Sequence, residues 1–191
     1  MKKAAALLVS LMLIVLALPT ASAEEEAVGT ASRILVVYFS ATGTTRGVAE
    51  KLSEGLSADL YEIVPEEPYT DADLNWNDRS SRTSIETDDP ACRPAIAGEL
   101  PDLTGYDTVL IGYPIWWGDV PRIVSNFVEQ VDLTGKTMAV FFTSGSSGLG
   151  NSMRHLEQQS GAGTWLEGKR FTSRTTVEEL VSWAEGLGIK P

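Results

Sequence analysis

Three uninterrupted runs of apolar residues constrain the fold of this chain most. They cover residues 33–39 (RILVVYF), 107–113 (DTVLIGY) and 137–142 (TMAVFF). A strand with one solvated face alternates apolar and polar residues, whereas a strand of a parallel sheet that is covered on both faces is apolar throughout. The runs therefore predict strands of a parallel sheet with helices packed on both of its faces.

The segments between these runs have helical and extended patterns in alternation. Thr45–Leu56 places Val48, Leu52 and Leu56 on one face, which is typical of an amphipathic helix. Further helices are predicted over 122–130, 152–160 and 176–187, and further strands over 58–64 and 165–171. This order predicts an α/β fold, a three-layer sandwich with a five-stranded parallel sheet and helices on both faces.

Residues 66–101 interrupt the alternation. Prolines, acidic residues and Trp76 replace the apolar spacing there. A stretch this long inside a compact domain is typically either functional or poorly ordered. Trp76 precedes the polar residues 77–79, and the sequence favours a role at a binding site and a role in a packed lid equally. We interpret the segment as a long insertion into a single domain.

The first 23 residues have the pattern of a secretory leader. Lys2 and Lys3 precede an apolar run over 4–18, and the small residues 21–23 (ASA) form a cleavage site. The alternative is an uncut membrane anchor, although the run is shorter than the ~20 residues that span a bilayer. We therefore expect a signal peptide over 1–23, a flexible tether over 24–32 and one domain over 33–191, exported to the periplasm, cell envelope or medium and without a membrane span.

The charge of the chain narrows the classes of partner. Loss of residues 1–23 would leave 13 basic and 26 acidic residues, a net charge of −13. Such a surface repels nucleic acid and anionic lipid, and it either steers a basic protein partner or serves solubility alone.

Cys92 is the only cysteine, which excludes an intrachain disulfide. His155 is the only histidine, and a lone histidine on a helix is interpreted as a surface residue.

The loop after the first apolar run has the composition of a phosphate site. Its sequence over 40–45 is SATGTT, which places hydroxyl groups around a turn that opens a helix. Backbone N–H groups at a helix N-terminus bind phosphate oxygens. The loop has no lysine and lacks the G-x-x-x-x-G-K-[ST] spacing, which argues against a nucleotide triphosphate.

Two later loops have the composition of a site for a planar ligand. Residues 114–121 (PIWWGDVP) contain adjacent tryptophans, for which a flat aromatic ligand is a natural partner. The alternative is that one or both indoles cover the edge of the sheet. Residues 143–150 (TSGSSGLG) lack bulky side chains, so their backbone amides can approach a ring closely unless the loop is simply mobile.

The three loops together resemble the flavodoxin family. Ser40-x-Thr42-Gly43-x-Thr45 is similar to that family's phosphate loop, [ST]-x-T-G-x-T, which follows its first strand. The resemblance spans residues 34–189 and is strongest to a bacterial branch that includes exported members. The resemblance implies strand order 2-1-3-4-5 and an FMN cofactor at the carboxyl ends of the strands. Open α/β sheets generally bind ligands there, and flavodoxin is itself a standard example of this rule.

The resemblance also implies which residues bind FMN. The phosphate would be held by Ser40, Thr42, Gly43, Thr44 and Thr45. The ring would be enclosed by Pro114, Ile115, Trp116, Trp117 and Gly118 and by Thr143, Ser144, Gly145, Ser146 and Gly148. The third loop lacks the aromatic residue that electron-carrier flavodoxins often have there, so one ring face is either open to a substrate or covered by Trp76.

The sequence therefore predicts an FMN-dependent redox protein and leaves its reaction open. An electron carrier would present the ring edge to a redox partner protein, and a reductase would pass electrons from NAD(P)H to a quinone-type acceptor. The alternative is a flavin-free module that keeps the fold and binds a protein through the acidic insertion. The sequence has no H-x-x-x-H pair and no Ser/His/Asp arrangement, so metal-dependent hydrolysis has no support.

Overall fold

A computed structural model describes residues 33–190. The predicted leader and tether lie outside the described residues. The helices and strands follow each other in the order β1 (Ile34–Tyr38), α1 (Thr44–Leu56), β2 (Asp59–Glu62), α2 (Arg82–Asp88), β3 (Thr108–Pro114), α3 (Arg122–Gln130), β4 (Thr137–Thr143), α4 (Ser152–Ser160), β5 (Thr164–Trp165), β6 (Lys169–Phe171) and α5 (Val177–Gly186).

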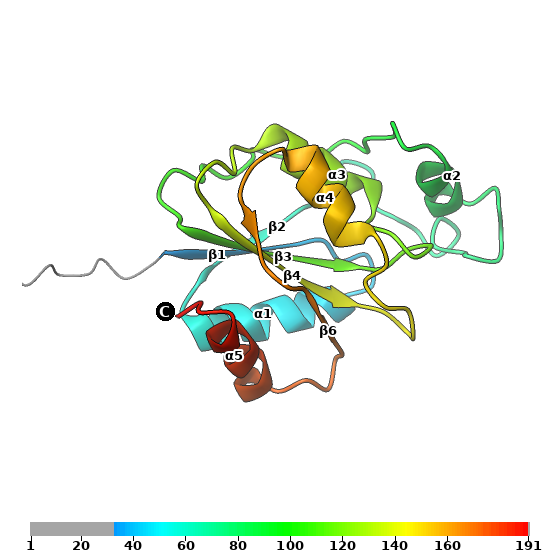
Figure 1. The fold of residues 1–191 in the computed structure, drawn as a ribbon. Coiled ribbons are helices and arrows are strands. Elements are labelled where there is room, and N and C mark those ends of the chain that lie inside the picture. Colours follow the sequence, from blue (N-terminus) through cyan, green and yellow to red (C-terminus); the bar gives the residue numbers. More distant parts are fainter. Residues whose placement is uncertain (1–32, 191) are drawn as a thin grey trace, which may run out of the picture. The chain divides into compact units, whose positions relative to one another are not determined.

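The strands form one parallel sheet with the order β2-β1-β3-β4-β5, as the family resemblance implies, and β6 also pairs with β4. Helices α1 and α5 pack together on one face, and α3 and α4 pack together on the other (Figure 1). The short helix α2 lies apart from both layers, beyond the carboxyl ends of the strands. The arrangement is the doubly wound α/β sandwich expected from the alternating pattern.

The apolar run of β1 is buried on both faces of the sheet. Leu35 and Val37 belong to the core on the side of α3 and α4, whereas Ile34 and Val36 belong to the core on the side of α1 and α5. Side chains alternate between the faces of a strand, so a strand covered on both faces needs apolar residues at every position. The prediction from the uninterrupted runs is confirmed.

One glycine of the sheet is required by a close approach. A Cβ atom on Gly112 of β3 would lie 2.1 Å from the ring of Phe141, which is fully buried on the neighbouring strand β4. The ring occupies the space that any side chain at position 112 would need. The pair lies two residues before the end of each strand, next to the loops that follow β3 and β4.

The structure differs from the sequence prediction in two places. Residues 165–171 form two short strands rather than one, because the edge segment has three residues (166–168) where β4 has two (139–140) between successive pairs. An extra residue of this kind breaks the ladder locally, as in a β-bulge. Within 66–101, where no regular element was expected, residues 82–88 form α2.

Two features are absent from residues 33–190. No helix within 33–190 is long and apolar enough to cross a membrane. The same residues contain no group of three or more histidine, cysteine, aspartate or glutamate side chains placed to hold a metal ion.

Candidate functional site

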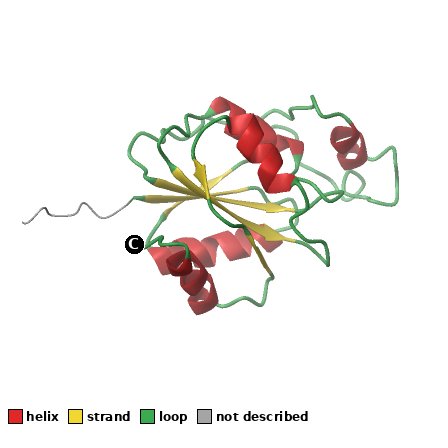
Figure 2. Ribbon diagram, viewed as in Figure 1, coloured by secondary structure: helices red, strands yellow, loops and turns green. Residues whose placement is uncertain are grey.

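The three predicted loops meet at the carboxyl edge of the sheet (Figure 2). Thr45 of the first loop and Thr143 of the third have their hydroxyl oxygens 2.8 Å apart. The N–H of Ile115 in the second loop donates to the carbonyl of Thr143 at 2.9 Å. A Cβ on Gly150 would lie 2.4 Å from the carbonyl oxygen of Gly118, so the second and third loops touch through their backbones. The structure therefore brings the predicted residues together.

The first loop presents unpaired N–H groups at the start of α1. The first hydrogen bond of the helix runs from the N–H of Gly47 to the carbonyl of Gly43 at 3.0 Å, and no side chain caps this end. The N–H groups of residues 42–46 donate no hydrogen bond to any group within residues 33–190. Thr42, Gly43 and Thr44 are exposed, and Ser40 is half-buried. Exposed N–H and hydroxyl donors at a helix N-terminus are complementary to a phosphate group.

The conformation of this loop depends on Gly43. Its φ is +85°, and nothing lies within 4 Å of the position where a Cβ would stand. The requirement for glycine is therefore conformational and not steric, because other residues adopt this φ at a cost. The turn directs the N–H groups that follow it outward from the end of α1.

The second loop forms a tight turn over residues 116–119, before α3 begins. Trp116 and Asp119 exchange two backbone hydrogen bonds, of 3.0 and 2.9 Å. The two residues between them, Trp117 and Gly118, have φ of +53° and +77°. Positive φ at both central residues is the pattern of a type I′ turn. A bulky residue such as tryptophan is rare in this conformation, and its presence there costs free energy.

The two indoles of this turn have different environments. Trp116 is half-buried and packs edge-on against Phe39 and Tyr69, with centroid distances of 5.3 and 5.1 Å. Trp117 is 39% exposed, and the guanidinium of Arg79 lies 5.1 Å from its ring centroid. Trp116 thus packs against the protein, as expected for an indole that covers the edge of the sheet. Trp117 instead has an exposed ring that a ligand can contact.

Two hydrogen bonds hold the first half of the third loop. The hydroxyl of Ser144 donates to the carbonyl of Ser147, and Arg170 of β6 donates to the carbonyl of Gly145 at 2.9 Å. Residues 145–148 are exposed and carry no aromatic side chain. The backbone of this loop is therefore accessible at the position where the sequence predicts contacts with a ring.

A half-buried polar cluster within the insertion holds Tyr69, whose ring packs against Trp116 of the second loop. The hydroxyl of Tyr69 donates to the carboxylate of Glu86 at 2.7 Å, and Arg82 donates to the same carboxylate at 2.6 Å. Arg82 also lies 4.1 Å from the centroid of the Tyr69 ring. Burial, and then the Glu86 carboxylate, raise the pKa of Tyr69 far above its usual value. The cluster fixes Tyr69 against Trp116, so the insertion is an ordered part of the site.

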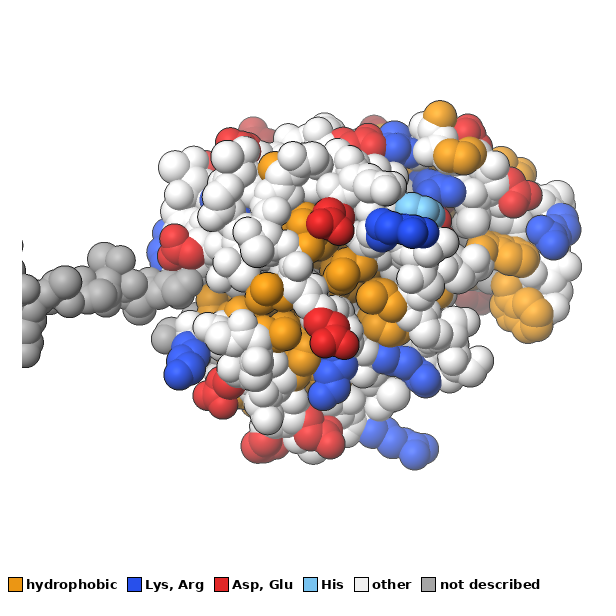
Figure 3. Space-filling view, viewed as in Figure 1, with side chains coloured by type: hydrophobic (Ala, Val, Ile, Leu, Met, Phe, Trp, Pro, Cys, Tyr) orange, Lys and Arg blue, Asp and Glu red, His pale blue; other side chains and the backbone are white. Residues whose placement is uncertain are grey.

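Trp76, the predicted ring cover, lies on the surface of this insertion. Its side chain is 71% exposed, which is incompatible with packing in the core. Figure 3 shows hydrophobic side chains exposed at this end of the molecule, beyond the carboxyl ends of the strands. Tyr69 and Arg79, which contact the two tryptophans of the second loop, were missed by the sequence analysis because contacts between an irregular insertion and a loop have no periodic signature.

His155 lies at the surface, with 36% of its side chain exposed, and it is also paired with a residue of the second loop, which the sequence did not predict. Its Nδ1 lies 2.9 Å from both carboxylate oxygens of Asp119, the residue that closes the second loop. Sequence patterns do not show that two residues on different elements, such as His155 and Asp119, are in contact. The sequence contained one signal, an ionisable residue directly after the Trp-Trp-Gly motif.

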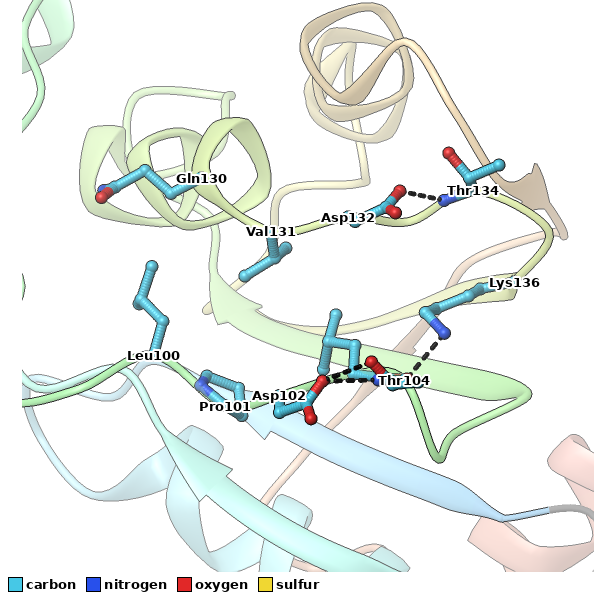
Figure 4. Close-up of a pocket in the computed structure, with 10 residues that line it drawn as sticks. Leu100, Pro101, Asp102, Thr104, Gln130, Val131, Asp132, Thr134 and Lys136 are labelled. Atoms are coloured by element: carbon cyan, nitrogen blue, oxygen red, sulfur yellow. Dashed lines mark hydrogen bonds between the residues drawn. The ribbon is translucent and has the colours of Figure 1, made fainter.

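A separate cleft of about 390 Å³ lies at the opposite end of the sheet. Figure 4 shows its polar groups, which serve the surrounding turns. Lys136 donates to the carbonyls of Leu103 and Tyr106, and Asp102 and Asp132 accept hydrogen bonds from N–H groups two residues further on. These groups satisfy local backbone atoms, so we assign the cleft no part in the candidate site.

The fold and the site define a doubly wound α/β protein whose loops meet beyond the ends of β1, β3 and β4, the place where such folds bind ligands. A family model described as flavodoxin matches residues 33–187, and the chain belongs to that family.

Solved structures agree with this assignment. A candidate flavoprotein of Bacteroides eggerthii is 46% identical with a TM-score of 0.79, and the match covers 83% of this chain and 99% of that one. A candidate flavoprotein of Bacteroides uniformis is 40% identical with a TM-score of 0.77, over 82% and 99% of the two chains. A Lactobacillus acidophilus flavoprotein solved in complex with FMN is 25% identical with a TM-score of 0.61, over 73% and 93%.

Proposed function

We propose that this protein binds FMN at the three loops and uses it for electron transfer. The observation that supports this most is the set of unpaired N–H groups and exposed hydroxyls at the N-terminus of α1. The family assignment and the FMN complex of the Lactobacillus acidophilus flavoprotein support the same cofactor. A phosphate needs several donors at once, and the first loop offers them at the place where the fold binds ligands.

In this proposal the first loop holds the phosphate. Ser40, Thr42 and Thr44 contribute hydroxyl groups, and Gly43 gives the turn its conformation. Thr45 is buried and bonded to Thr143, so it acts from behind the loop and ties it to the third loop. The partial positive charge of the helix N-terminus favours the anion further.

The second and third loops enclose the ring. Trp117 supplies an exposed aromatic surface, and the chain segment 143–148 supplies backbone amides without bulky side chains. FMN supplies the electron-accepting and electron-donating chemistry, and the protein orients it and sets its surroundings. The net negative charge of the chain disfavours additional negative charge on the reduced flavin.

We propose further that the protein acts as a reductase for a small acceptor and not purely as a carrier. The support is the absence of an aromatic side chain from the exposed residues 145–148 within the described chain, which leaves space for a substrate beside the ring. Turnover with NADPH and a quinone tests this. No reduction of the quinone by flavin-loaded protein would leave electron transfer to a partner protein as the function.

Export of the protein is also part of the proposal. Its support is the leader pattern of residues 1–23. A mass spectrum of the protein recovered from the cell exterior or periplasm tests it, and an intact N-terminal mass would contradict cleavage after Ala23.

The experiment that tests FMN binding compares two ligands. Purified full-length chain is titrated with FMN and with riboflavin, which lacks the phosphate, and flavin fluorescence and visible absorbance are followed. We expect FMN to bind much more tightly than riboflavin, because only FMN uses the first loop. Colourless protein that binds neither ligand would contradict the proposal and favour a flavin-free module that docks a protein.

A further inference from the structure

Asp119 controls the conformation of the second loop. Its N–H and its carbonyl both bond to Trp116, so it fixes the end of the turn that contains Trp117 and Gly118. Trp117 is held there at a φ of +53°, a conformation that tryptophan adopts only when its surroundings impose it. Whatever holds Asp119 therefore also holds the exposed indole and the backbone that we place against the flavin.

The carboxylate of Asp119 has three partners. The N–H of Val120 donates at 2.8 Å, His155 Nδ1 lies 2.9 Å from both oxygens, and a guanidinium nitrogen of Arg122 lies 3.6 Å away. A carboxylate only accepts hydrogen bonds, so Nδ1 of His155 carries the proton in this contact. The contact with Asp119 uses Nδ1 and leaves the other ring nitrogen, Nε2, outside it.

Of the residue types that face Asp119, histidine is the one whose charge generally changes between about pH 5 and 8. Arg122 is buried and bonds the carbonyls of Glu86 and Thr87, and a guanidinium stays protonated in proteins. His155 is 36% exposed beside a cleft of about 350 Å³ that Pro90, Gln158 and Gln159 also line. Figure 3 shows histidine atoms at the surface of this face. Protons therefore reach His155 from solvent.

We propose that His155 is a positioning residue for the flavin site. Acting through Asp119, its imidazole holds the Trp116–Asp119 turn, and it holds the turn more firmly when protonated. The imidazolium donates a charge-assisted hydrogen bond, which is stronger than that of the neutral ring. The proposal rests on the proposed function in one respect, that residues 114–118 contact the flavin.

The charged groups around His155 set the size of this effect. Asp119 and Arg122 face it from the second loop and from α3, and Arg154 on its own helix is exposed and bonds Asn151. Arg122 already compensates part of the Asp119 charge, so protonation of His155 adds to an existing ion pair. We expect a change of about three- to fivefold in affinity and no loss of binding.

The first test measures FMN affinity at about pH 5.5 and about pH 8.5, on either side of the range in which histidine changes charge. It uses full-length wild-type chain, His155→Gln and the control Arg154→Gln, which removes a cation from the same helix. The FMN phosphate also titrates near pH 6, so the readout is the ratio of variant to wild-type affinity at each pH. We expect His155→Gln to bind about three- to fivefold more weakly at the lower pH and about equally at the higher pH. Arg154→Gln should follow the wild type throughout.

The second test needs no flavin. Amide hydrogen exchange of Asp119 and Trp116, followed by NMR in flavin-free protein, reports the opening of the turn directly. We expect His155→Gln to lose about three- to fivefold of the protection at the lower pH, and to match the wild type at the higher pH. Equal protection in both proteins at both pH values overturns the proposal.

The two tests separate the inference from the proposed function. Tight FMN binding with a ratio that does not change with pH overturns the role of His155 and leaves the flavin site intact. Absence of FMN binding overturns the proposed function, and amide exchange then decides alone whether His155 holds the turn.

Discussion

The hydroxyl oxygens of Thr45 and Thr143 lie 2.8 Å apart, and both side chains are buried. Thr45 stands in the first turn of α1, and Thr143 is the last residue of β4. The contact joins the loop that we assign to the phosphate and the loop that we assign to the ring. In a pair of hydroxyls one donates to the other, which leaves one proton for a third group.

Replacing one member of this pair should destabilise the protein. Thr45→Val keeps the shape of the side chain but leaves the Thr143 hydroxyl buried without its partner. The cost of an unsatisfied buried polar group is about 1–3 kcal/mol. Urea unfolding of the flavin-free protein measures it, and a change below a few tenths of a kcal/mol would mean that water replaces the lost hydroxyl.

The double variant Thr45→Val/Thr143→Val separates stability from ligand binding. Removal of both hydroxyls leaves no unpaired group, so the double variant should be more stable than Thr45→Val alone. FMN affinity should be lower than in the wild type in both variants, because the hydrogen bond that ties the first loop to the third is lost. If the double variant regains both wild-type stability and wild-type FMN affinity, the hydroxyl pair contributes to stability and not to FMN binding.

The fold was predictable because its strongest signals are local. Uninterrupted apolar runs identify β1, β3 and β4, and the four-residue spacing of Val48, Leu52 and Leu56 identifies α1. The division of residues 165–171 into β5 and β6 was not predictable. It arises from one extra residue opposite residues 139–140 of β4, and the amino-acid composition does not indicate such an insertion. Strand order came from the family resemblance, since periodicity does not state which strands are neighbours.

A direct test of the phosphate assignment is Thr42→Val. Thr42 is exposed beside the free N–H groups of α1 and has no recorded partner among residues 33–190. Loss of its hydroxyl should weaken FMN binding by about 1–3 kcal/mol, the cost of losing one hydrogen-bond donor to a phosphate oxygen. The free energy of unfolding should change little.

Flavin titration measures the affinity, and riboflavin provides the matched comparison. Riboflavin affinity should be unchanged by Thr42→Val because riboflavin has no phosphate. Thr134→Val, an exposed threonine before β4 at the other end of the sheet, is the control for the substitution itself. Unchanged FMN affinity in Thr42→Val would contradict the assigned phosphate site.

The strained tryptophan of the second loop provides a second test. Trp117→Asn places an Asn-Gly pair at the centre of the turn, which is the preferred sequence of a type I′ turn. Relief of the left-handed conformation is worth about 1–2 kcal/mol and offsets the lost contact with Arg79. We therefore expect stability close to that of the wild type or above it.

FMN affinity should move in the opposite direction in the same variant. An aromatic contact contributes about 0.5–1.5 kcal/mol beyond its buried area, so binding should weaken about two- to twelvefold. Calorimetric unfolding and flavin titration measure the two effects. Unchanged affinity would show that Trp117 does not contact the ring.

The residues that the sequence did not reveal share one physical property. Tyr69, Arg79 and His155 act through contacts with another segment of the chain, and none of them belongs to a motif. Ser40–Thr45 was found because one loop and one helix end suffice to build a phosphate site. A site assembled from an insertion, a turn and a helix has no pattern that one segment could display.

The last prediction concerns the buried tyrosines and alkaline pH. Burial raises the pKa of Tyr113 and of Tyr69 far above the usual value, and in Tyr69 the neighbouring Glu86 adds to the effect. The folded protein therefore keeps these protons above about pH 10, where the unfolded chain releases them. Because the unfolded state then binds fewer protons, stability is complete below about pH 10 and falls as the pH rises beyond it.

Urea unfolding from about pH 8 to about pH 11 measures this loss, which reaches at most about 1.4 kcal/mol per pH unit for each tyrosine that stays protonated. Tyr113→Phe should make the decline shallower, because phenylalanine has no proton to lose in the unfolded state. Tyr106→Phe, at a less buried tyrosine, should change the slope less. An equally steep decline in Tyr113→Phe would mean that other groups dominate the alkaline unfolding.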